Sequence, residues 1–148
     1  MKKSTIALAA SLSLLVLPAL AADNGTAPEA KAMLEKAVTA VKTDKTKALG
    51  QFSSGEGGFK DRDLYVFCIG SDGTFNAHPN KALLGKDARG LKDSTGKAFA
   101  VEMISVASEG SFSQVDYTFP RPGGTDPAPK SSYVTKISDE VCGVGYYK

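Results

Sequence analysis

The chain has 148 residues with 18 basic and 16 acidic side chains, so its formal net charge is +2. Lys2 and Lys3 account for this excess, and the rest of the chain is balanced at 16 basic and 16 acidic residues. A neutral domain without a basic stripe is not expected to bind nucleic acid, which requires a positively charged surface. The length corresponds to one domain with one core.

The first 21 residues show the three parts of a cleavable secretory signal peptide in the right order. Two lysines precede an uncharged, mostly apolar run over residues 4–18, and Ala19-Leu20-Ala21 fits a small-residue cleavage site. The run is shorter than the roughly 20 residues of a membrane-spanning helix, and no stop-transfer segment follows. The alternative is an uncleaved amphipathic or membrane helix. The sequence therefore predicts a periplasmic protein whose mature domain is residues 22–148.

The start of the mature chain has the pattern of a buried helix. Thr26 and Glu29 are spaced as a capping box, and Pro28 falls in the first turn, where its missing N–H is harmless. Apolar residues then recur at helical spacing, which predicts a helix over residues 27–43. A second helical stretch is expected over residues 44–52, before a loop rich in glycine and serine.

Farther along, the pattern changes to strands separated by turns. An apolar run over residues 64–69 predicts a central strand, and an Asp-Gly turn leads to a returning strand over residues 74–78. A long irregular segment over residues 80–95 and a helix over residues 97–109 follow. An exposed, proline-rich loop is expected over residues 120–129. The last three strands are expected over residues 111–119, 130–137 and 140–147.

This order of elements predicts the α+β class. Five mostly antiparallel strands would carry the long N-terminal helix on one face. The helical crossover between the second and third strands would pass over the opposite face, where it can roof a pocket.

Cys68 and Cys142 both fall in segments with strand patterns. In an oxidising compartment an even number of cysteines suggests a disulfide. Such a bond would close a loop of about 75 residues, worth roughly 4 kcal/mol on the chain-entropy model. The alternative is that both are buried, small apolar residues.

Seven short stretches form a pattern in order and spacing: Leu64-Tyr65-Val66-Phe67, Asp72-Gly73-Thr74, Ala77-His78-Pro79, Leu84-Gly85-Lys86, Gly96-Lys97-Ala98-Phe99, Pro129-Lys130-Ser131-Ser132-Tyr133-Val134 and Gly143-Val144-Gly145-Tyr146-Tyr147. Over about residues 28–148 the chain thereby resembles the single Cache domain family, extracytoplasmic relatives of the PAS fold. The resemblance implies a long N-terminal helix on a five-stranded antiparallel sheet whose first and fifth strands are neighbours. That arrangement would bring Cys68 and Cys142 within disulfide reach.

The resemblance also implies a function. Cache domains bind small molecules, often short organic acids, in a pocket between the sheet and the long loop, and most belong to chemoreceptors and histidine kinases. This chain departs from that pattern because no transmembrane helix or signalling domain follows the last strand. We therefore expect a free-standing periplasmic binding protein that reaches a membrane receptor or kinase only through a partner. The alternative is an interaction or accessory protein that docks to a membrane sensor or transporter.

Three polar residues are candidates for the ligand site. His78, the only histidine, is held by Pro79 and could donate a hydrogen bond to a carboxylate, or could merely cap the loop at the surface. Lys130 and Tyr133 have the strongest family match. A lysine facing a carboxylate makes a charge-assisted hydrogen bond worth about 1.5–3 kcal/mol. Because positions 130 and 133 differ by an odd number, both can face one pocket only if Lys130 precedes the regular pleat. The alternative to a ligand-binding role is that Lys130 is a solvated strand end.

Apolar candidates for the pocket wall, each of which could also be ordinary core, are Tyr65, Phe67, Met103 and Tyr117. No metal or other cofactor is expected, because the single histidine has no clustered cysteine or carboxylate ligands beside it. The sequence has no nucleophile elbow, catalytic triad pattern or phosphate loop, so we do not expect an enzyme.

Overall fold

Residues 23–148 are those described by the structure, a computed structural model. The predicted signal peptide and its cleavage site lie outside the described residues. Within residues 23–148, no helix is both long enough and apolar enough to span a membrane.

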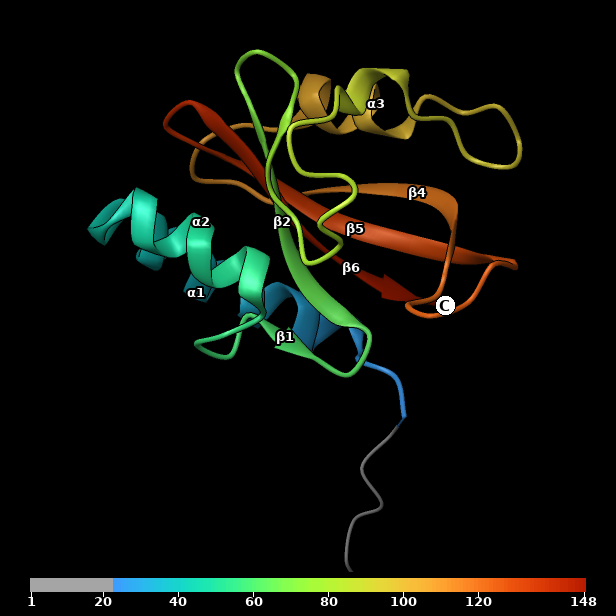
Figure 1. Cartoon of the computed structure of the whole chain (residues 1–148), viewed down its shortest axis with the longest axis horizontal. Helices are drawn as coiled ribbons and strands as arrows, with labels where there is room; N and C mark the ends of the chain where they lie inside the picture. Colours follow the sequence, from blue (N-terminus) through green and yellow to red (C-terminus); the bar gives the residue numbers. More distant parts are fainter. Residues whose placement is uncertain (1–22) are drawn as a thin grey trace, which may run out of the picture.

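Two helices cover one face of the sheet, α1 (Ala27–Thr43) and α2 (Lys45–Ser54) (Figure 1). The predicted capping box is confirmed, because Thr26 Oγ1 accepts from the Glu29 N–H at 3.4 Å and Glu29 Oε2 accepts from the Thr26 N–H at 2.7 Å. Asp44 separates the helices and caps α2 by accepting from the backbone N–H of Lys47. The predicted bounds of the first helix are correct, and the second extends two residues beyond its prediction.

The sheet is antiparallel throughout, with the order β1-β2-β6-β5-β4 and with β3 paired to β2. Its strands are β1 (Lys60–Asp61), β2 (Leu64–Gly70), β3 (Phe75–Ala77), β4 (Ser113–Pro120), β5 (Pro127–Ile137) and β6 (Glu140–Tyr147). The α+β plan and the neighbouring first and last long strands, β2 and β6, are confirmed. Strand β1 was not predicted, because two residues are too few to show a periodicity.

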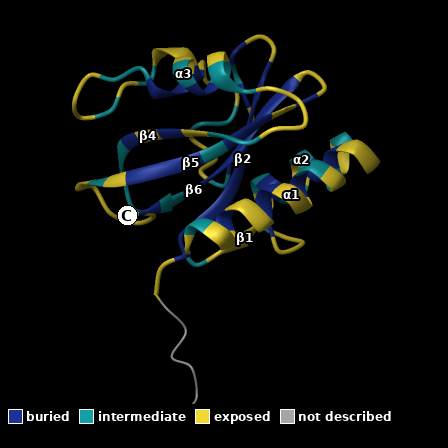
Figure 2. Ribbon diagram, turned by 180° about the vertical axis from the view of Figure 1, so that it is seen from behind, coloured by how far each residue is buried: buried dark blue, intermediate teal, exposed yellow. Residues whose placement is uncertain are grey.

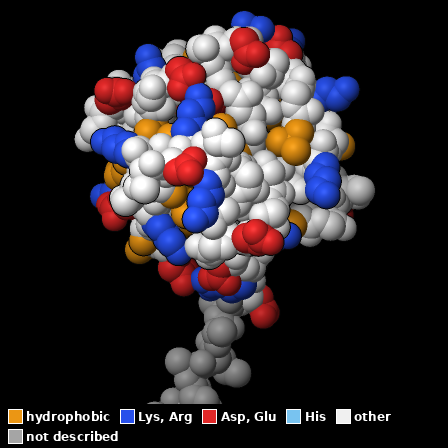
Figure 3. All heavy atoms as spheres, turned by 60° about the vertical axis from the view of Figure 1, so that its left-hand side comes forward, with side chains coloured by type: hydrophobic (Ala, Val, Ile, Leu, Met, Phe, Trp, Pro, Cys, Tyr) orange, Lys and Arg blue, Asp and Glu red, His pale blue; other side chains and the backbone are white. Residues whose placement is uncertain are grey.

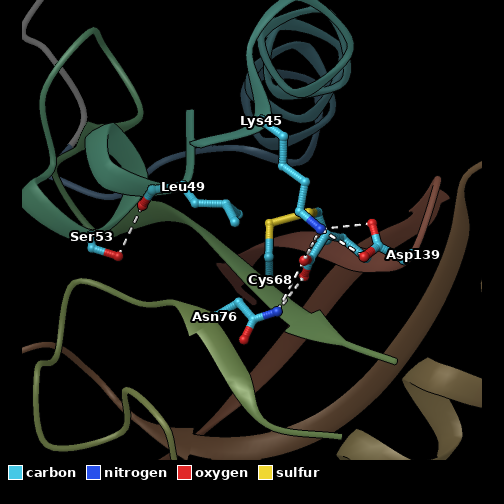
Figure 4. The surroundings of a disulfide bond; sticks show 8 residues. Lys45, Leu49, Ser53, Cys68, Asn76 and Asp139 are labelled. Atoms are coloured by element: carbon cyan, nitrogen blue, oxygen red, sulfur yellow. Dashed lines mark hydrogen bonds and ion pairs between the residues drawn. A yellow bond between two sulfur atoms is a disulfide. The ribbon is translucent and has the colours of Figure 1, made fainter. Parts of the chain in front are cut away.

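The predicted disulfide is present between these two neighbouring strands. Cys68 of β2 and Cys142 of β6 are directly paired across the ladder, with their Cα atoms 4.1 Å apart. Next to the bond, the buried carboxylate of Glu140 forms an ion pair with Lys45 of α2, with 2.8 Å between Oε1 and Nζ. The same oxygen accepts a hydrogen bond from the Asn76 side-chain amide of β3 at 2.9 Å (Figure 4). This region therefore ties the helix layer to the centre of the sheet.

The opposite face is covered by the crossover between β3 and β4, which contains the short 3-10 helix η1 (Ala88–Gly90) and α3 (Phe99–Val106) (Figure 1). Helix α3 is shorter than the predicted 97–109. Asp93 Oδ1 accepts from the backbone N–H groups of Thr95 and Lys97, and this turn keeps Lys97 outside the helix.

The predicted loop over residues 120–129 is also shorter in the structure. Strand β4 runs through Pro120 and β5 begins at Pro127, with these two prolines paired across the ladder. Pro120 is tolerated because β4 is the edge strand, and Pro127 because it is the first residue of β5, before the part of that strand that pairs with β6.

The sheet buries apolar side chains on both faces. Along β2, Leu64, Val66 and Cys68 pack toward the helices, whereas Tyr65, Phe67 and Ile69 belong to the cluster under the crossover. This double burial explains the continuous apolar run in the sequence, and Figure 2 shows β2 buried along its length. On the outer surface, basic and acidic side chains are interspersed over the face drawn in Figure 3.

Candidate functional site

A small cavity lies between the sheet and the crossover, and we call it the inner cavity. Its volume is about 20 Å³, which is room for about one water molecule. The inner cavity is lined mainly by aromatic and aliphatic side chains: Tyr65, Phe67, Ile69, Phe75, His78, Leu83, Leu91, Phe99, Ala100, Met103, Tyr117 and Phe119. The structure thus brings together all four apolar candidates and His78.

The wall of the inner cavity formed by α3 and β4 is held in place by ring stacking and a hydrogen bond. The rings of Phe99 from α3 and Tyr117 from β4 stack with centroids 4.5 Å apart and planes 10° from parallel. The Tyr117 hydroxyl and Ser132 Oγ are hydrogen-bonded at 2.9 Å. Burial raises the pKa of Tyr117, so its hydroxyl stays protonated.

His78 follows the short strand β3 and is buried, rather than being a surface cap. Its Nδ1 accepts from the backbone N–H of Asn80 at 2.9 Å, and its ring packs against Tyr65 and Phe75. Burial, aided by the positive charge of Lys130, lowers the pKa of His78 to about 4. The imidazole is therefore neutral at neutral pH. With Nδ1 acting as an acceptor, Nε2 carries the hydrogen and can donate to a ligand.

Lys130 is not a solvated strand end, because only 1% of it is exposed. Its Nζ donates to the Tyr65 hydroxyl at 2.9 Å. Three aromatic rings surround the amine, with Nζ-to-centroid distances of 4.4 Å for Tyr65, 4.7 Å for Tyr147 and 5.5 Å for Phe119. Among residues 23–148, no carboxylate forms an ion pair with it.

The electrostatic environment of Lys130 is unusual for a lysine. Burial lowers its pKa to about 7, while the nearby Asp63 carboxylate favours the charged form and the Arg121 guanidinium opposes it. Near neutral pH the amine is thus close to half protonated. An added anion would shift it toward the charged form.

A glycine on β6 makes room for the buried lysine. A Cβ atom on Gly145 would lie inside van der Waals distance of Lys130 Cε and 2.6 Å from Ser132 Oγ. Two residues earlier, a Cβ on Gly143 would lie 2.5 Å from Cζ of Phe67. The alternating glycines of β6 therefore leave the space that the side chains of Lys130, Ser132 and Phe67 occupy, a role that the sequence analysis did not assign to them.

Tyr133 lies away from the inner cavity, on the opposite face of the sheet. It packs beside Tyr146 with ring centroids 5.9 Å apart, against the core cluster under α1. The reason is the odd spacing from Lys130: β5 is already regular from Pro127, so Lys130 does not precede the pleat as the shared pocket would require.

A larger cavity of about 420 Å³ adjoins the inner cavity, and we call it the outer vestibule. Tyr65, His78 and Phe119 line both spaces. Lys60 and Arg121 add positive charge to the vestibule wall. Among the described residues, no aspartate or glutamate lines either cavity, so the arrangement favours an anionic ligand. Within the same part of the chain, no group of three or more His, Cys, Asp or Glu side chains could hold a metal ion.

An antiparallel sheet with a helical layer on one face and a pocket under the crossover on the other is the architecture of a PAS-like domain. The family model for single Cache domain 2 matches residues 18–147. The chain therefore belongs to the single Cache domain family, whose members are sensory ligand-binding modules and typically extracytoplasmic.

Solved structures of chemotaxis sensors have the same fold. A methyl-accepting chemotaxis protein from Vibrio parahaemolyticus is 28% identical, with a TM-score of 0.66, and the match covers 81% of this chain and 86% of that one. The periplasmic sensor domain of a chemotaxis protein is 26% identical, with a TM-score of 0.63 and coverage of 79% and 86%. A Cache chemosensory domain described for carboxylic acid recognition is 24% identical, with a TM-score of 0.62 and coverage of 79% and 84%. Comparison with curated proteins finds no match.

Proposed function

We propose that this domain binds a small carboxylic acid at the inner cavity and outer vestibule, without catalysing a reaction. The observation that carries the proposal is the buried amine of Lys130, which has no ion-pair partner among residues 23–148. Lys130 is not itself a lining residue, but it donates to the hydroxyl of Tyr65, which lines both cavities, and no acidic side chain of the described residues lines either one. A buried charge without a partner is costly, and a ligand carboxylate would supply that partner. The carboxylic acid recognition described for one solved Cache domain supports the same ligand class, although its 24% identity establishes only a shared fold.

The geometry suggests how the acid would be held. The carboxylate would accept from Lys130, with the Tyr65 hydroxyl and the Nε2–H of His78 as further donors. A short apolar tail would lie against Phe67 and Met103 in the inner cavity. Because that cavity holds about one water molecule, the tail must be small and its wall must adjust on binding.

The proposal extends to where the domain acts. The predicted signal peptide, residues 1–21, would deliver it to the periplasm. A membrane receptor or kinase would then bind the ligand-loaded domain. Recovery of the mature protein from the periplasmic fraction, together with co-purification of such a partner only when acid is present, would test this.

Titration calorimetry with acetate, propionate and butyrate tests the ligand class. We expect Lys130→Gln to weaken binding by about tenfold to a hundredfold, since it removes a charge-assisted hydrogen bond worth about 1.5–3 kcal/mol. Lys136→Gln on the same strand is the matched control, because Lys136 is exposed and should leave affinity unchanged. If no acid binds the wild type, or if Lys130→Gln binds as well as the wild type, the proposal is wrong.

Acid affinity should depend on pH through Lys130. Its pKa in the empty domain is about 7, so the charged form that holds a carboxylate is fully present below pH 7 and is lost as pH rises above it. We expect affinity to level off below about pH 6 and to fall toward tenfold per pH unit above about pH 8. His78, with its pKa near 4, stays neutral over that range. Lys130→Arg should remove the dependence, because a guanidinium stays charged.

The stability of the empty domain should rise with pH, whereas the acid affinity should fall with pH. An unfolded lysine titrates near 10.5, so the unfolded chain binds more protons than the folded one between about pH 7 and 10.5. The contribution of Lys130 to stability is therefore complete above that range and is lost as pH falls to 7. Calorimetric binding and denaturant unfolding, measured across the same buffers, should show these opposite slopes for the wild type and neither slope for Lys130→Gln.

A further inference from the structure

We propose that Arg121 forms a second anion-binding group in the outer vestibule, and that the site takes short dicarboxylic acids with one carboxylate at Lys130 and the other at Arg121. This inference rests on the proposed function, because Lys130 is the first of the two anion-binding groups. It adds a residue that the sequence analysis did not select, from the loop after β4.

The two cations share one aromatic ring. Arg121 Cζ lies 4.3 Å from the centroid of Tyr147, and Lys130 Nζ lies 4.7 Å from the same centroid. The ring is fixed in turn, because the Tyr147 hydroxyl donates to the backbone carbonyl of Pro120 at 2.6 Å. Tyr147 thus holds a guanidinium and an ammonium close together, and stacking on an aromatic face orients the guanidinium in advance.

The charges around this ring do not balance. Asp63 is the one carboxylate that influences Lys130 and pairs with Arg121, at 3.3 Å from Oδ2 to Nη1. Its other oxygen, Oδ1, accepts from the backbone N–H of Gly25 at 2.6 Å. When Lys130 is protonated, one buried acid therefore faces two cations, and that acid already accepts a hydrogen bond from the backbone. The remaining positive charge favours a ligand that brings more than one negative charge.

Arg121 also keeps free donors for such a ligand. Its Nη1 donates to Asn24 Oδ1 at 2.9 Å and to Asp63, but among residues 23–148 neither Nη2 nor Nε donates to a protein acceptor. The side chain lines the vestibule, whose volume of about 420 Å³ exceeds that of the inner cavity many times over. A second carboxylate can therefore be accommodated there and can accept from the unused edge of the guanidinium in a two-pronged contact.

Succinate and butyrate have the same four-carbon chain and differ in the second carboxylate, so they isolate this subsite. By calorimetry we expect the wild type to bind succinate at least tenfold more tightly than butyrate. Arg121→Gln should lower the affinity for succinate by about tenfold or more and change the affinity for butyrate by less than twofold. Lys136→Gln is again the matched control, since Lys136 is exposed, lines neither cavity and should change neither affinity by more than twofold.

The possible outcomes separate this inference from the proposed function. If the wild type binds butyrate more tightly than succinate, or if Arg121→Gln lowers the affinity for both acids equally, the second subsite is wrong. The proposed acid site at Lys130 is unaffected by either result. No binding of any mono- or dicarboxylate would overturn both. Thermal unfolding checks that the variants are folded. Arg121→Lys keeps the charge without the planar fork, so it should lose part of the succinate affinity, and it replaces the glutamine variant if that one unfolds.

Discussion

Replacing Cys68 and Cys142 together with alanine is expected to lower the free energy of unfolding by about 4 kcal/mol. The disulfide closes 74 residues of sequence separation, so its loss frees most of the domain in the unfolded state. Both side chains are fully buried, and alanine leaves small gaps at two central strands that add to the loss. This is a large fraction of the stability of a domain of this size.

Chemical denaturation of the oxidised wild type and the double variant measures this effect. A reductant should bring the wild type close to the double variant and should leave the double variant unchanged, which separates the cross-link from the cavity. A double variant within about 1 kcal/mol of the oxidised wild type would show that the covalent link is not a main source of stability. Because Glu140 still joins α2 and β3 to the sheet, we expect the reduced fold to keep its native topology.

Gly145→Ala is expected to abolish most of the acid binding while the domain still folds. The added methyl group would overlap Lys130 Cε and approach Ser132 Oγ to 2.6 Å, so both side chains must move. Lys130 would then lose its position beside Tyr65, and the Tyr117–Ser132 hydrogen bond would be strained. We expect acid affinity to fall about tenfold to a hundredfold, the range for losing the charge-assisted bond, with an overpacking cost of about 1–3 kcal/mol in stability.

Gly50→Ala provides the control for this substitution. Gly50 lies in the exposed part of α2, and a Cβ there meets no atom within 4 Å. Replacing a helical glycine by alanine should stabilise the domain by up to about 1 kcal/mol and leave acid affinity unchanged. Unaltered acid affinity in Gly145→Ala would mean that the lack of a side chain at Gly145 is not needed to position Lys130.

Local patterns in the sequence predicted much of the fold. The capping box at Thr26 and Glu29 and the apolar spacing after it define α1, because these interactions form within one or two helical turns. The apolar run at residues 64–69 predicted the central strand β2, because both faces of that strand are buried. The pairing of Cys68 with Cys142 was suggested by the even number of cysteines, and the family resemblance supported it by implying that their strands are neighbours.

Tertiary structure decided the composition of the site. The sequence pointed to His78, Lys130 and the aromatic wall, but it could not place Lys130 and Tyr133 on one face or opposite faces, because that depended on where the pleat of β5 begins. No sequence pattern identified Arg121. Its proposed role depends on the position of β6 in the sheet, which places the Tyr147 ring against both Arg121 and Lys130. Charge and composition along the chain thus established a neutral, balanced domain. The cluster of Lys130, Arg121 and Asp63 around the site arises only from the tertiary fold, which brings together residues that are far apart in the sequence.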